Sequence, residues 1–566
     1  MAENLNVARL LDDIADIYEM KEVRFKPRAY RRAAQTIRSL GEPVEDIRDR
    51  GELEGIPGIG RNIAAKIVEY LDTGRIEKHE ELKKELPVDI DELTSIEGLG
   101  PKKVMKLYQE LGIRSLEDLK EAAEEGRIAG IEGFGEKTEK TILENIEFAK
   151  NARDRFLLGY AIFESDRLIS ALGDHCSRLE VAGSLRRKRE TVGDIDILAV
   201  SEDPGKVMEL FVSMEQVQKV IARGKKKSSV RLDSGINVDL RLIEDESYGS
   251  ALQYFTGSKQ HNVHLRTIAR KGGMKLSEYG LFKGDKLVAG RNEEEVYRGM
   301  GLDWIPPEMR EDNGEIELAA DGGLPDLVGI EDIRCDLQMH STWSDGKDTL
   351  HDMASRCREL GYEYAVITDH VGEIRVANAL DLNRIRKQKK EIARIEDELD
   401  FRIIQGVEAN IRKDGSLDVE KELMEEAEIV LAAVHSAFRM DRKEMTERLV
   451  NAVSSGDLHI LAHPLGRKIQ ERKPIDVDLD RVLEAASDAG TIMEVNAFPE
   501  RLDLNGYNVK RALDAGVRLS IGTDAHMREH LGYIQLGVST ARRGWATADD
   551  IMNTRSEKEL LRALGK

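Results

Sequence analysis

In three stretches of the chain, the order of apolar and polar residues predicts an element of secondary structure. In Asp194–Val200 the apolar run carries acids two positions apart, which predicts a buried strand with both carboxylates on one face. Residues 235–243 alternate apolar and polar side chains, which predicts a second strand with Asp239 on its polar side. Residues 63–71 place apolar side chains at helical spacing and predict an amphipathic helix that packs inward.

After a connection with glycines and prolines at residues 314–325, short apolar strands alternate with charged helices, which predicts an α/β barrel. Residue types that bind metals stand at apparent strand ends: His340, Asp345, His370, Glu408, His435, His463, Asp524, His526 and, as a weaker ligand, Gln338. Because a barrel brings strand ends to one face, these side chains are expected to converge on metal ions. Taken singly, each histidine is also compatible with a structural or exposed position.

A pattern of apolar-x-Gly-apolar-Gly occurs at residues 56–60, 96–100 and 131–135, each time before a helical stretch. Its glycines are Gly58, Gly60, Gly98, Gly100, Gly133 and Gly135. Glycine permits a tight turn with backbone N–H groups exposed at a helix N-terminus, where a phosphate binds without a base being read. The repeat resembles helix-hairpin-helix motifs, which implies sequence-independent DNA contact, with ordinary glycine-rich helix connections as the alternative.

The length of 566 residues predicts three or four domains. The formal net charge of −21 does not exclude a nucleic-acid partner, because binding follows local patches and basic residues cluster at 24–38 and 223–231. The three cysteines are widely spaced and odd in number, which argues against a disulfide framework or a cysteine zinc site. With no apolar run long enough to span a bilayer, we expect a soluble cytoplasmic protein without a membrane partner. We also expect a monomer.

The middle of the chain carries two sets of candidate catalytic residues. The set suited to phosphate comprises Gly183 and Ser184, which let backbone and hydroxyl approach, and the charged donors Arg186 and Arg187. The set suited to magnesium comprises Asp194, Asp196 and, on a neighbouring strand, Asp239, which would stand near an attacking 3′-hydroxyl. The alternative is a strand with solvated aspartates, because short motifs also occur by chance.

The segments GSLRR, GDIDI, VDLR and YFTGS occur in the order and approximate spacing found in family X DNA polymerases. The resemblance covers roughly the first 310 residues. It implies that Asp194, Asp196 and Asp239 hold Mg²⁺ or Mn²⁺ and carry out catalysis. The implied nucleotide-binding residues are Gly183, Ser184, Arg187, Gly193, Tyr254, Phe255, Gly257 and Asn262, and the implied DNA contacts include Arg241 and Arg266.

The first segment resembles the small amino-terminal domain of the DNA polymerase beta-like enzymes, which implies that Lys26 and Arg31 contact DNA. Lys66 stands where this family has a deoxyribose-phosphate lyase lysine, whose amine attacks an aldehyde as a Schiff-base nucleophile. A departure is Asn62, where the beta enzyme has another lysine.

The region from Arg334 to about Lys566 resembles the PHP phosphoesterase domain, a distorted (β/α) barrel. The resemblance implies a cluster of up to about three ions of manganese, zinc or both, held by the strand-end residues, that activates water to attack a phosphorus centre. The usual first motif is Asp-x-His-x-His, whereas this chain has Asp336, Gln338 and His340. Glutamine offers an oxygen but binds these metals more weakly than imidazole does.

We therefore expect a multidomain protein of the α+β and α/β classes. The expected parts are helix-hairpin-helix domains at 1–88 and 89–150, a nucleotidyltransferase palm at 151–242, a nascent-base-pair-binding subdomain at 243–315, a linker at 316–333 and a PHP domain at 334–566.

The expected activity is that of a DNA-directed DNA polymerase that fills short gaps during base excision repair, acting on gapped or primed duplex DNA and dNTPs, with a 3′–5′ exonuclease in the PHP domain. One alternative makes the PHP domain the main enzyme, a 3′-end nuclease, 3′-phosphatase or abasic-site endonuclease to which the polymerase half delivers DNA. Another makes the glycine repeats a scaffold that holds DNA ends for partners.

Overall fold

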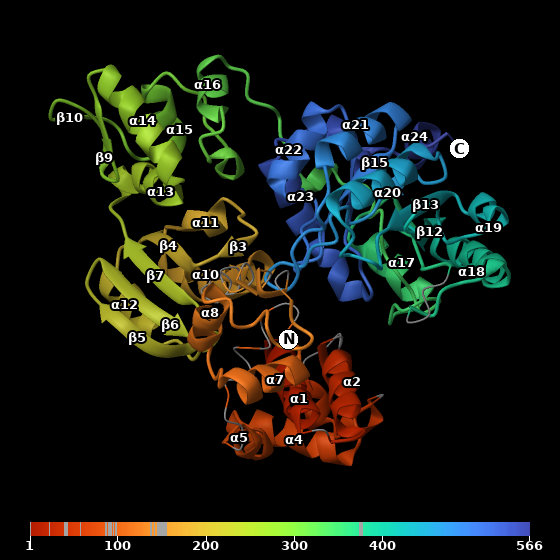
Figure 1. Cartoon of the computed structure of the whole chain (residues 1–566). Coiled ribbons are helices and arrows are strands. Elements are labelled where there is room, and N and C mark those ends of the chain that lie inside the picture. The colour runs from red at the N-terminus through yellow and green to blue at the C-terminus, as the bar shows by residue number, and fades with distance from the viewer. Residues whose placement is uncertain are drawn as a thin grey trace. The chain divides into compact units, whose positions relative to one another are not determined.

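Figure 1 shows the computed structural model, which describes residues 2–21, 23–38, 44–56, 58–84, 88, 93, 96, 99–135, 138–140, 142–143, 146, 155–372 and 377–565. The chain divides into two compact units. One consists of residues up to 154 with Gln470–Arg472, and the other of Arg155–Ile469 with Lys473–Lys566. Among the described residues, no helix is both long and apolar enough to cross a membrane.

The first unit consists of helices around one apolar core. These are α1 (Ala2–Met20), α2 (Lys26–Arg38), α3 (Val44–Asp49), α4 (Arg61–Thr73), α5 (Glu77–Lys84), α7 (Pro101–Leu111) and α8 (Leu116–Glu124), with a 3-10 turn at Leu53–Gly55. In α4, Ile63 and Ile67 are buried, and Tyr70 and Leu71 are partly buried against the same core. The amphipathic helix predicted at residues 63–71 is thus confirmed.

Each of the three glycine repeats contains the same hydrogen bond. The amide of the apolar residue before the last glycine donates to the first apolar residue: Ile59 N to Ile56 O at 3.0 Å, Leu99 N to Ile96 O at 2.9 Å, and Phe134 N to Ile131 O at 2.9 Å. Gly58 and Gly133 both have a φ of +88°, which side chains disfavour, while Gly98 lies outside the described residues. Gly60 and Gly100 cap α4 and α7 without a side-chain acceptor, so the first-turn amides suit an external anion.

The second unit begins with a five-stranded sheet in the order β2-β4-β7-β6-β5. Its strands are β2 (Arg178–Val181), β4 (Asp194–Val200), β5 (Val217–Arg223), β6 (Lys227–Leu232) and β7 (Asn237–Leu242). A separate two-stranded sheet consists of β1 (Phe156–Leu157) and β3 (Thr191–Val192). One face packs on α10 (Leu158–Leu172) and α12 (Pro204–Val212) through the apolar residues of β4 and β7. Since side chains alternate along a strand, the acidic residues lie on the opposite face.

A mixed helical and antiparallel region follows this sheet and has its own apolar core. It contains α13 (Tyr248–Thr256), α14 (Lys259–Lys271), β8 (Lys275–Ser277), β9 (Gly280–Lys283), β10 (Lys286–Ala289), α15 (Glu293–Gly299) and α16 (Glu315–Ala320), with 3-10 turns at Asp245–Ser247 and Pro307–Met309. Ile316 and Ala319 of α16 belong to the core of this region. The connection to the barrel therefore begins as a packed helix.

The last part is a curled parallel sheet in the order β11-β12-β13-β14-β15-β16. The strands are β11 (Tyr364–Ile367), β12 (Arg402–Asn410), β13 (Ile429–Ala433), β14 (Ile460–Leu461), β15 (Ile492–Asn496) and β16 (Leu519–Gly522). The segment around Met339 bonds to both edges of this sheet: Thr368 N donates to Met339 O at 2.8 Å after β11, and His340 N donates to Ala525 O at 2.8 Å after β16. These bonds join the two edges of the curled sheet through the segment around Met339, as the predicted barrel requires.

Helices surround the barrel strands, which are buried throughout most of their lengths. They are α17 (Leu350–Glu359), α18 (Leu382–Leu399), α19 (Lys421–Glu426), α20 (Arg442–Ser454), α21 (Leu479–Ala489), α22 (Gly506–Asp514), α23 (Ile534–Arg543) and α24 (Glu557–Ala563), with 3-10 turns at Ile330–Asp332, Arg528–Tyr533, Ala548–Asp550 and Met552–Thr554.

Within the second unit, the five-stranded sheet and the barrel share apolar packing. Leu502 and Leu536 of the barrel belong to the same core cluster as the sheet. At Gly159 of α10, a Cβ would lie 3.2 Å from Leu536 and 3.4 Å from Pro499, so α10 and α23 approach closely where the chain has no side chain. Arg467 adds an ion pair to Glu190 at 2.8 Å.

A buried ion group joins the sheet to the region that follows it. Glu293 is 5% exposed and accepts bidentate bonds from Arg186, at 2.9 and 2.8 Å, and from the fully buried Arg310, at 2.6 and 3.2 Å. Burial opposes ionisation of this carboxyl, but Arg310 and Arg186 lower its pKa to about 2.

Glu293→Gln is therefore expected to lower the free energy of unfolding of the second unit by about 3 kcal/mol at neutral pH, because two buried cations lose their counter-charge. Urea unfolding measures the loss. Since the pKa is lowered from 4.5 to about 2 on folding, the stabilisation is complete above about pH 4.5 and disappears as the pH falls through about 2. Glu294→Gln, on the exposed side of the same helix, serves as control; equal losses in both variants would contradict the assignment.

Candidate active sites

The first candidate site lies on the polar face of the five-stranded sheet. β4 and β7 pair in parallel, with Asp196 opposite Asp239 and Asp194 opposite Asn237. Asp194 and Asp196 share a face because they are two residues apart. Gly183 has a φ of +63°, and a Cβ there would lie 3.0 Å from Asp196 Oδ2, so the turn passes directly over this carboxylate. The sheet therefore brings the three aspartates and the glycine turn to one place.

Electrostatics make this face attractive to cations. Burial, with the nearby charges of Asp194 and Asp239, raises the pKa of Asp196 to about 6. Burial and Asp239 also raise the pKa of Asp194. Asp239 accepts from the Ser229 hydroxyl at 2.5 Å and pairs with Lys227 at 2.6 Å. Carboxylates that repel one another at this edge fit hard divalent cations such as Mg²⁺ or Mn²⁺.

The two arginines of the glycine turn have different surroundings. Arg186 is held by Glu293 and by the Thr256 hydroxyl at 2.7 Å, so it belongs to the buried ion group, and its contact with phosphate stays a prediction. Arg187 pairs with Glu311 at 3.2 Å and donates to the Thr256 carbonyl. Ser184 follows Gly183 in the short helix α11 (Gly183–Arg186). Gly193 immediately precedes β4.

The residues expected to meet the sugar and base lie on α13 and α14. Tyr254 and Phe255 are half-buried and pack edge to face, with ring centroids 5.2 Å apart. Gly257, with a φ of +74°, leaves room for Arg187, whose Nη1 would be 3.0 Å from a Cβ there. The amide of Asn262 bonds internally to Gln253 and to the Tyr254 carbonyl, both at 2.7 Å.

The implied DNA contacts are spread over both units. Arg241 lies 3.5 Å from Asp239 and 4.4 Å from the centroid of the Phe255 ring, whereas Arg266 is exposed on α14. In the first unit, Lys26 is exposed and lies over the Tyr18 ring at 4.6 Å. Their roles in DNA binding stay predictions.

Two further basic residues of the first unit already have protein partners. Arg31 pairs with Asp16 at 2.6 Å and with Glu19 at 2.5 Å. Lys66 is half-buried on α4, and its Nζ donates to the Asn62 carbonyl at 3.4 Å. DNA contact by Arg31 and the lyase role of Lys66 stay predictions.

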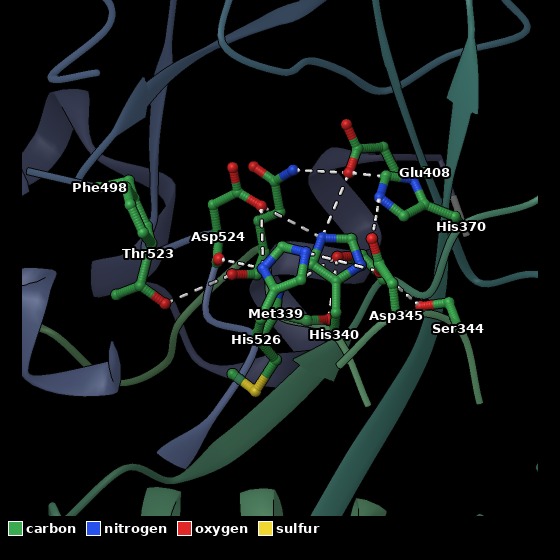
Figure 2. Close-up of polar contacts among 12 residues, drawn as sticks. Met339, His340, Ser344, Asp345, His370, Glu408, Phe498, Thr523, Asp524 and His526 are labelled. Atoms are coloured by element: carbon green, nitrogen blue, oxygen red, sulfur yellow. Dashed lines mark hydrogen bonds and ion pairs between the residues drawn. The ribbon is translucent and has the colours of Figure 1, made fainter. Parts of the chain in front are cut away.

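The second candidate site lies at the strand ends of the barrel, where Figure 2 shows His340, Asp345, His370, Glu408, Asp524 and His526 pointing toward one another. The nitrogen–oxygen distances are 3.3 Å from His340 Nε2 to both Glu408 Oε2 and Asp524 Oδ1, 3.7 Å from His370 Nε2 to Asp345 Oδ2, 3.5 Å from His526 Nε2 to Asp345 Oδ1, and 3.1 and 3.2 Å from Glu408 Oε1 to the Nε2 atoms of His435 and His463. All eight strand-end residues predicted as ligands thus converge.

Glu408 stands at the centre of this cluster and is 1% exposed. Burial opposes its ionisation, yet the surrounding imidazoles hold its pKa well below the usual range. Burial lowers the pKa of His370 to about 4, which favours the neutral imidazole that binds metals. Burial opposes ionisation of Asp345, but the hydrogen bond with His526 and the nearby charges of His340 and His370 lower its pKa to about 2.

The donor atoms fit divalent metal ions. Among the described residues, three groups have ligand atoms within 4.8 Å of one another, and all are in the barrel: His340, Asp345, His370 and His526; His370, Glu408 and His435; His340, Glu408 and Asp524. Buried imidazole nitrogens of His340, His370, His435 and His463 have no hydrogen-bond partner in the part of the chain that the structure describes. Buried lone pairs of this kind call for a further partner, and a metal ion supplies one.

Gln338 and Glu494 are buried beside these ligands. Gln338 Nε2 donates to Glu408 Oε2 at 2.9 Å, and its Oε1 has no partner among the described residues. Glu494, which the sequence analysis missed, is buried on β15 near Gln338: a Cβ at Gly522 would lie 2.1 Å from Glu494 Oε1 and 2.7 Å from the Gln338 Cβ. Burial raises the pKa of Glu494 well above the usual range. An acid inside an otherwise apolar strand was the signal that could have identified it.

Four family models match separate parts of the chain. They are a helix-hairpin-helix domain at residues 2–76, a SAM-like helix-hairpin-helix tandem at 90–147, the DNA polymerase beta thumb at 251–311 and the PHP domain at 336–497. The thumb model ends at Glu311, which pairs with Arg187, and the PHP model covers Gln338 to Glu494 of the histidine cluster.

Known proteins resemble the whole chain or one half of it. DNA polymerase lambda of Rattus norvegicus is 26% identical over 54% of this chain and 56% of its own length, and a probable phosphatase of Thermoanaerobacter sp. (strain X514) is 25% identical over 36% and 84%. The DNA polymerase/3′-5′ exonuclease PolX of Bacillus subtilis (strain 168) is 38% identical over 98% of both chains. The chain therefore belongs to the family X DNA polymerases that carry helix-hairpin-helix domains and a C-terminal PHP domain.

Proposed function

We propose that the aspartate-bearing sheet extends DNA and that the histidine-rich barrel removes nucleotides from 3′ ends, within one enzyme. The observation that carries the polymerase assignment is the register of β4 and β7, which sets Asp196 opposite Asp239 with Asp194 on the same face. The name of the Bacillus subtilis relative combines the same two activities, DNA polymerase and 3′-5′ exonuclease.

In the polymerase reaction, Gly183, Ser184 and Arg187 would bind the triphosphate, because the turn over Asp196 presents backbone, hydroxyl and guanidinium donors. Asp239 would accept the proton of the primer 3′-hydroxyl, with Ser229 and Lys227 orienting its carboxylate. Mg²⁺ or Mn²⁺ held by the aspartates would stabilise the charge that develops on the transferring phosphoryl group.

Tyr254 and Phe255 would support the sugar of the incoming dNTP, with Asn262 near its base. The glycine turns would hold the backbone of a gapped or primed duplex through helix N-termini, without reading its sequence. Filling of short gaps in base excision repair is the role that we infer for this combination of duplex binding and polymerisation.

In the barrel, the eight converging side chains would hold manganese, zinc or both, and these metals would supply a Lewis acid and an activated water for attack on phosphorus. Glu408 stays ionised at the centre and orients His340, His435 and His463. The likeness of this half to a probable phosphatase favours a second candidate activity on the same metals, removal of a 3′-phosphate.

Separate variants should divide the two activities. Asp239→Ala is expected to reduce extension of a gapped duplex by about three orders of magnitude and to retain release of 3′ nucleotides, because several kcal/mol of transition-state stabilisation is lost only at the first site. His370→Ala should show the reverse. Labelled primers resolved on gels measure both.

The controls are Asp233→Ala, at an exposed turn after β6, and His351→Ala, on the surface of α17. Undiminished extension by Asp239→Ala would refute the polymerase site, and undiminished release by His370→Ala would refute the metal site. A primer with a 3′-phosphate distinguishes nucleotide release from phosphatase activity.

Gln338→His should restore the imidazole of the usual first motif. We expect metal affinity in the barrel to rise about tenfold, with faster release of 3′ nucleotides at limiting Mn²⁺, because imidazole is the better ligand. Metal analysis after dialysis and Mn²⁺ titration of the nuclease measure the effect. Gln535→His, exposed on α23, controls for an added histidine; unchanged metal content in Gln338→His would show that position 338 does not limit the site.

A further inference from the structure

The C-terminal end of α23, a barrel helix, contacts the turn that carries Arg187. Arg543 is 14% exposed in its side chain, and its Nη1 donates to the Arg187 main-chain carbonyl at 2.5 Å. Its Nη2 donates to Glu311 Oε1 at 3.1 Å. A residue of the barrel therefore bonds both to Arg187 and to the carboxylate that pairs with Arg187.

Glu311 is the shared acceptor of a cationic group. Its Oε1 lies 3.2 Å from Arg187 Nε, 3.1 Å from Arg543 Nη2 and 3.6 Å from Arg189 Nη1. Burial opposes ionisation of Glu311, but Arg187, Arg543 and Arg189 lower its pKa. Three guanidinium groups around one carboxylate leave an excess of positive charge, so Arg187 can turn toward an anion without leaving Glu311 unpaired.

Arg543 allows Arg187 to turn from Glu311 toward an anion, because it supplies Glu311 with another close counter-charge. Arg189 is largely exposed and lies farther from Glu311, so it neutralises the carboxylate weakly. Without Arg543, the half-buried Glu311 would depend on Arg187 for its counter-charge and would compete with a phosphate for the same guanidinium. The bond to the Arg187 carbonyl also fixes the backbone from which this side chain extends.

We propose that Arg543 is a positioning residue for nucleotide binding, through which the PHP domain neutralises Glu311 and leaves Arg187 available to the triphosphate of the incoming dNTP. The inference rests on the proposed function of Arg187. Under it, the barrel contributes to polymerisation through this contact, independently of its metals.

Steady-state single-nucleotide insertion on a gapped duplex tests the proposal with the full-length protein. Arg543→Ala is expected to raise the KM for dNTP about tenfold with little change in kcat, because the triphosphate loses the same binding free energy in the ground state and in the transition state. Arg543→Lys, which keeps the charge but not the fork of donors, should give an intermediate KM. Release of 3′ nucleotides should be unchanged in both variants, which also reports that the barrel is folded.

A second substitution separates positioning from simple support. Glu311→Gln in the Arg543→Ala background removes the competing charge and should recover at least about half of the lost affinity on a logarithmic scale. Lost packing would not be recovered by a further substitution at the same contact. The absence of recovery, or an unchanged KM in Arg543→Ala, would overturn the proposal.

Arg542 provides the matched control. It is the preceding residue of α23, pairs with Glu308 at 2.8 Å and donates to the Val328 carbonyl at 3.0 Å. Arg542→Ala should leave the KM for dNTP within about twofold of wild type, and an equal rise in both variants would assign the effect to docking of α23 in general. Arg187→Ala separates the proposed function of Arg187 from the positioning role of Arg543. An unchanged KM for dNTP in Arg187→Ala refutes the role of Arg187 in binding the triphosphate. A raised KM in Arg187→Ala together with an unchanged KM in Arg543→Ala refutes only the positioning role of Arg543.

Discussion

The buried charge of Glu408 is the constraint on which the barrel site depends. A carboxylate at that depth costs several kcal/mol unless charged or hydrogen-bonding partners surround it. The parallel sheet and the segment around Met339 supply them, because together they bring His340, His435, His463 and Gln338 within 3.3 Å of the two carboxylate oxygens. Closure of the sheet by the segment around Met339 is part of the same arrangement, since it places Gln338 and His340 between β11 and β16.

The polymerase face follows from a simpler constraint. Alternation along β4 and β7 commits one face to the core with α10 and α12, so Asp194, Asp196 and Asp239 must share the other. Burial and the mutual repulsion of the carboxylates raise the pKa of Asp196 there to about 6, and Lys227 offsets part of the negative charge. The structure thus holds a set of carboxylates whose charge favours metal ions.

The two catalytic halves of the second unit are not independent bodies joined by a tether. Leu502 and Leu536 of the barrel pack in the core of the sheet, and the absence of a side chain at Gly159 permits the close approach of α10 and α23. Polar contacts converge on the same boundary, where Arg543 reaches the turn of Arg187. If Arg187 binds the incoming nucleotide as proposed, a PHP domain joined in this way contributes to that site through Arg543, independently of its metals.

Local pattern by itself determined the amphipathic helix at 63–71, the recurring glycine turns, the shared face of Asp194 and Asp196, and the strand-end positions of the barrel ligands, because each depends on the period of one element. Only the tertiary structure decided the register that sets Asp196 opposite Asp239, the position of Glu494 beside Gln338, and the pairing of Arg186 with Glu293. It also decided the contact between Arg187 and Arg543, which are 356 positions apart. Such contacts depend on which surfaces meet when separate elements pack, and the spacing of residues within one element does not indicate which surfaces those are.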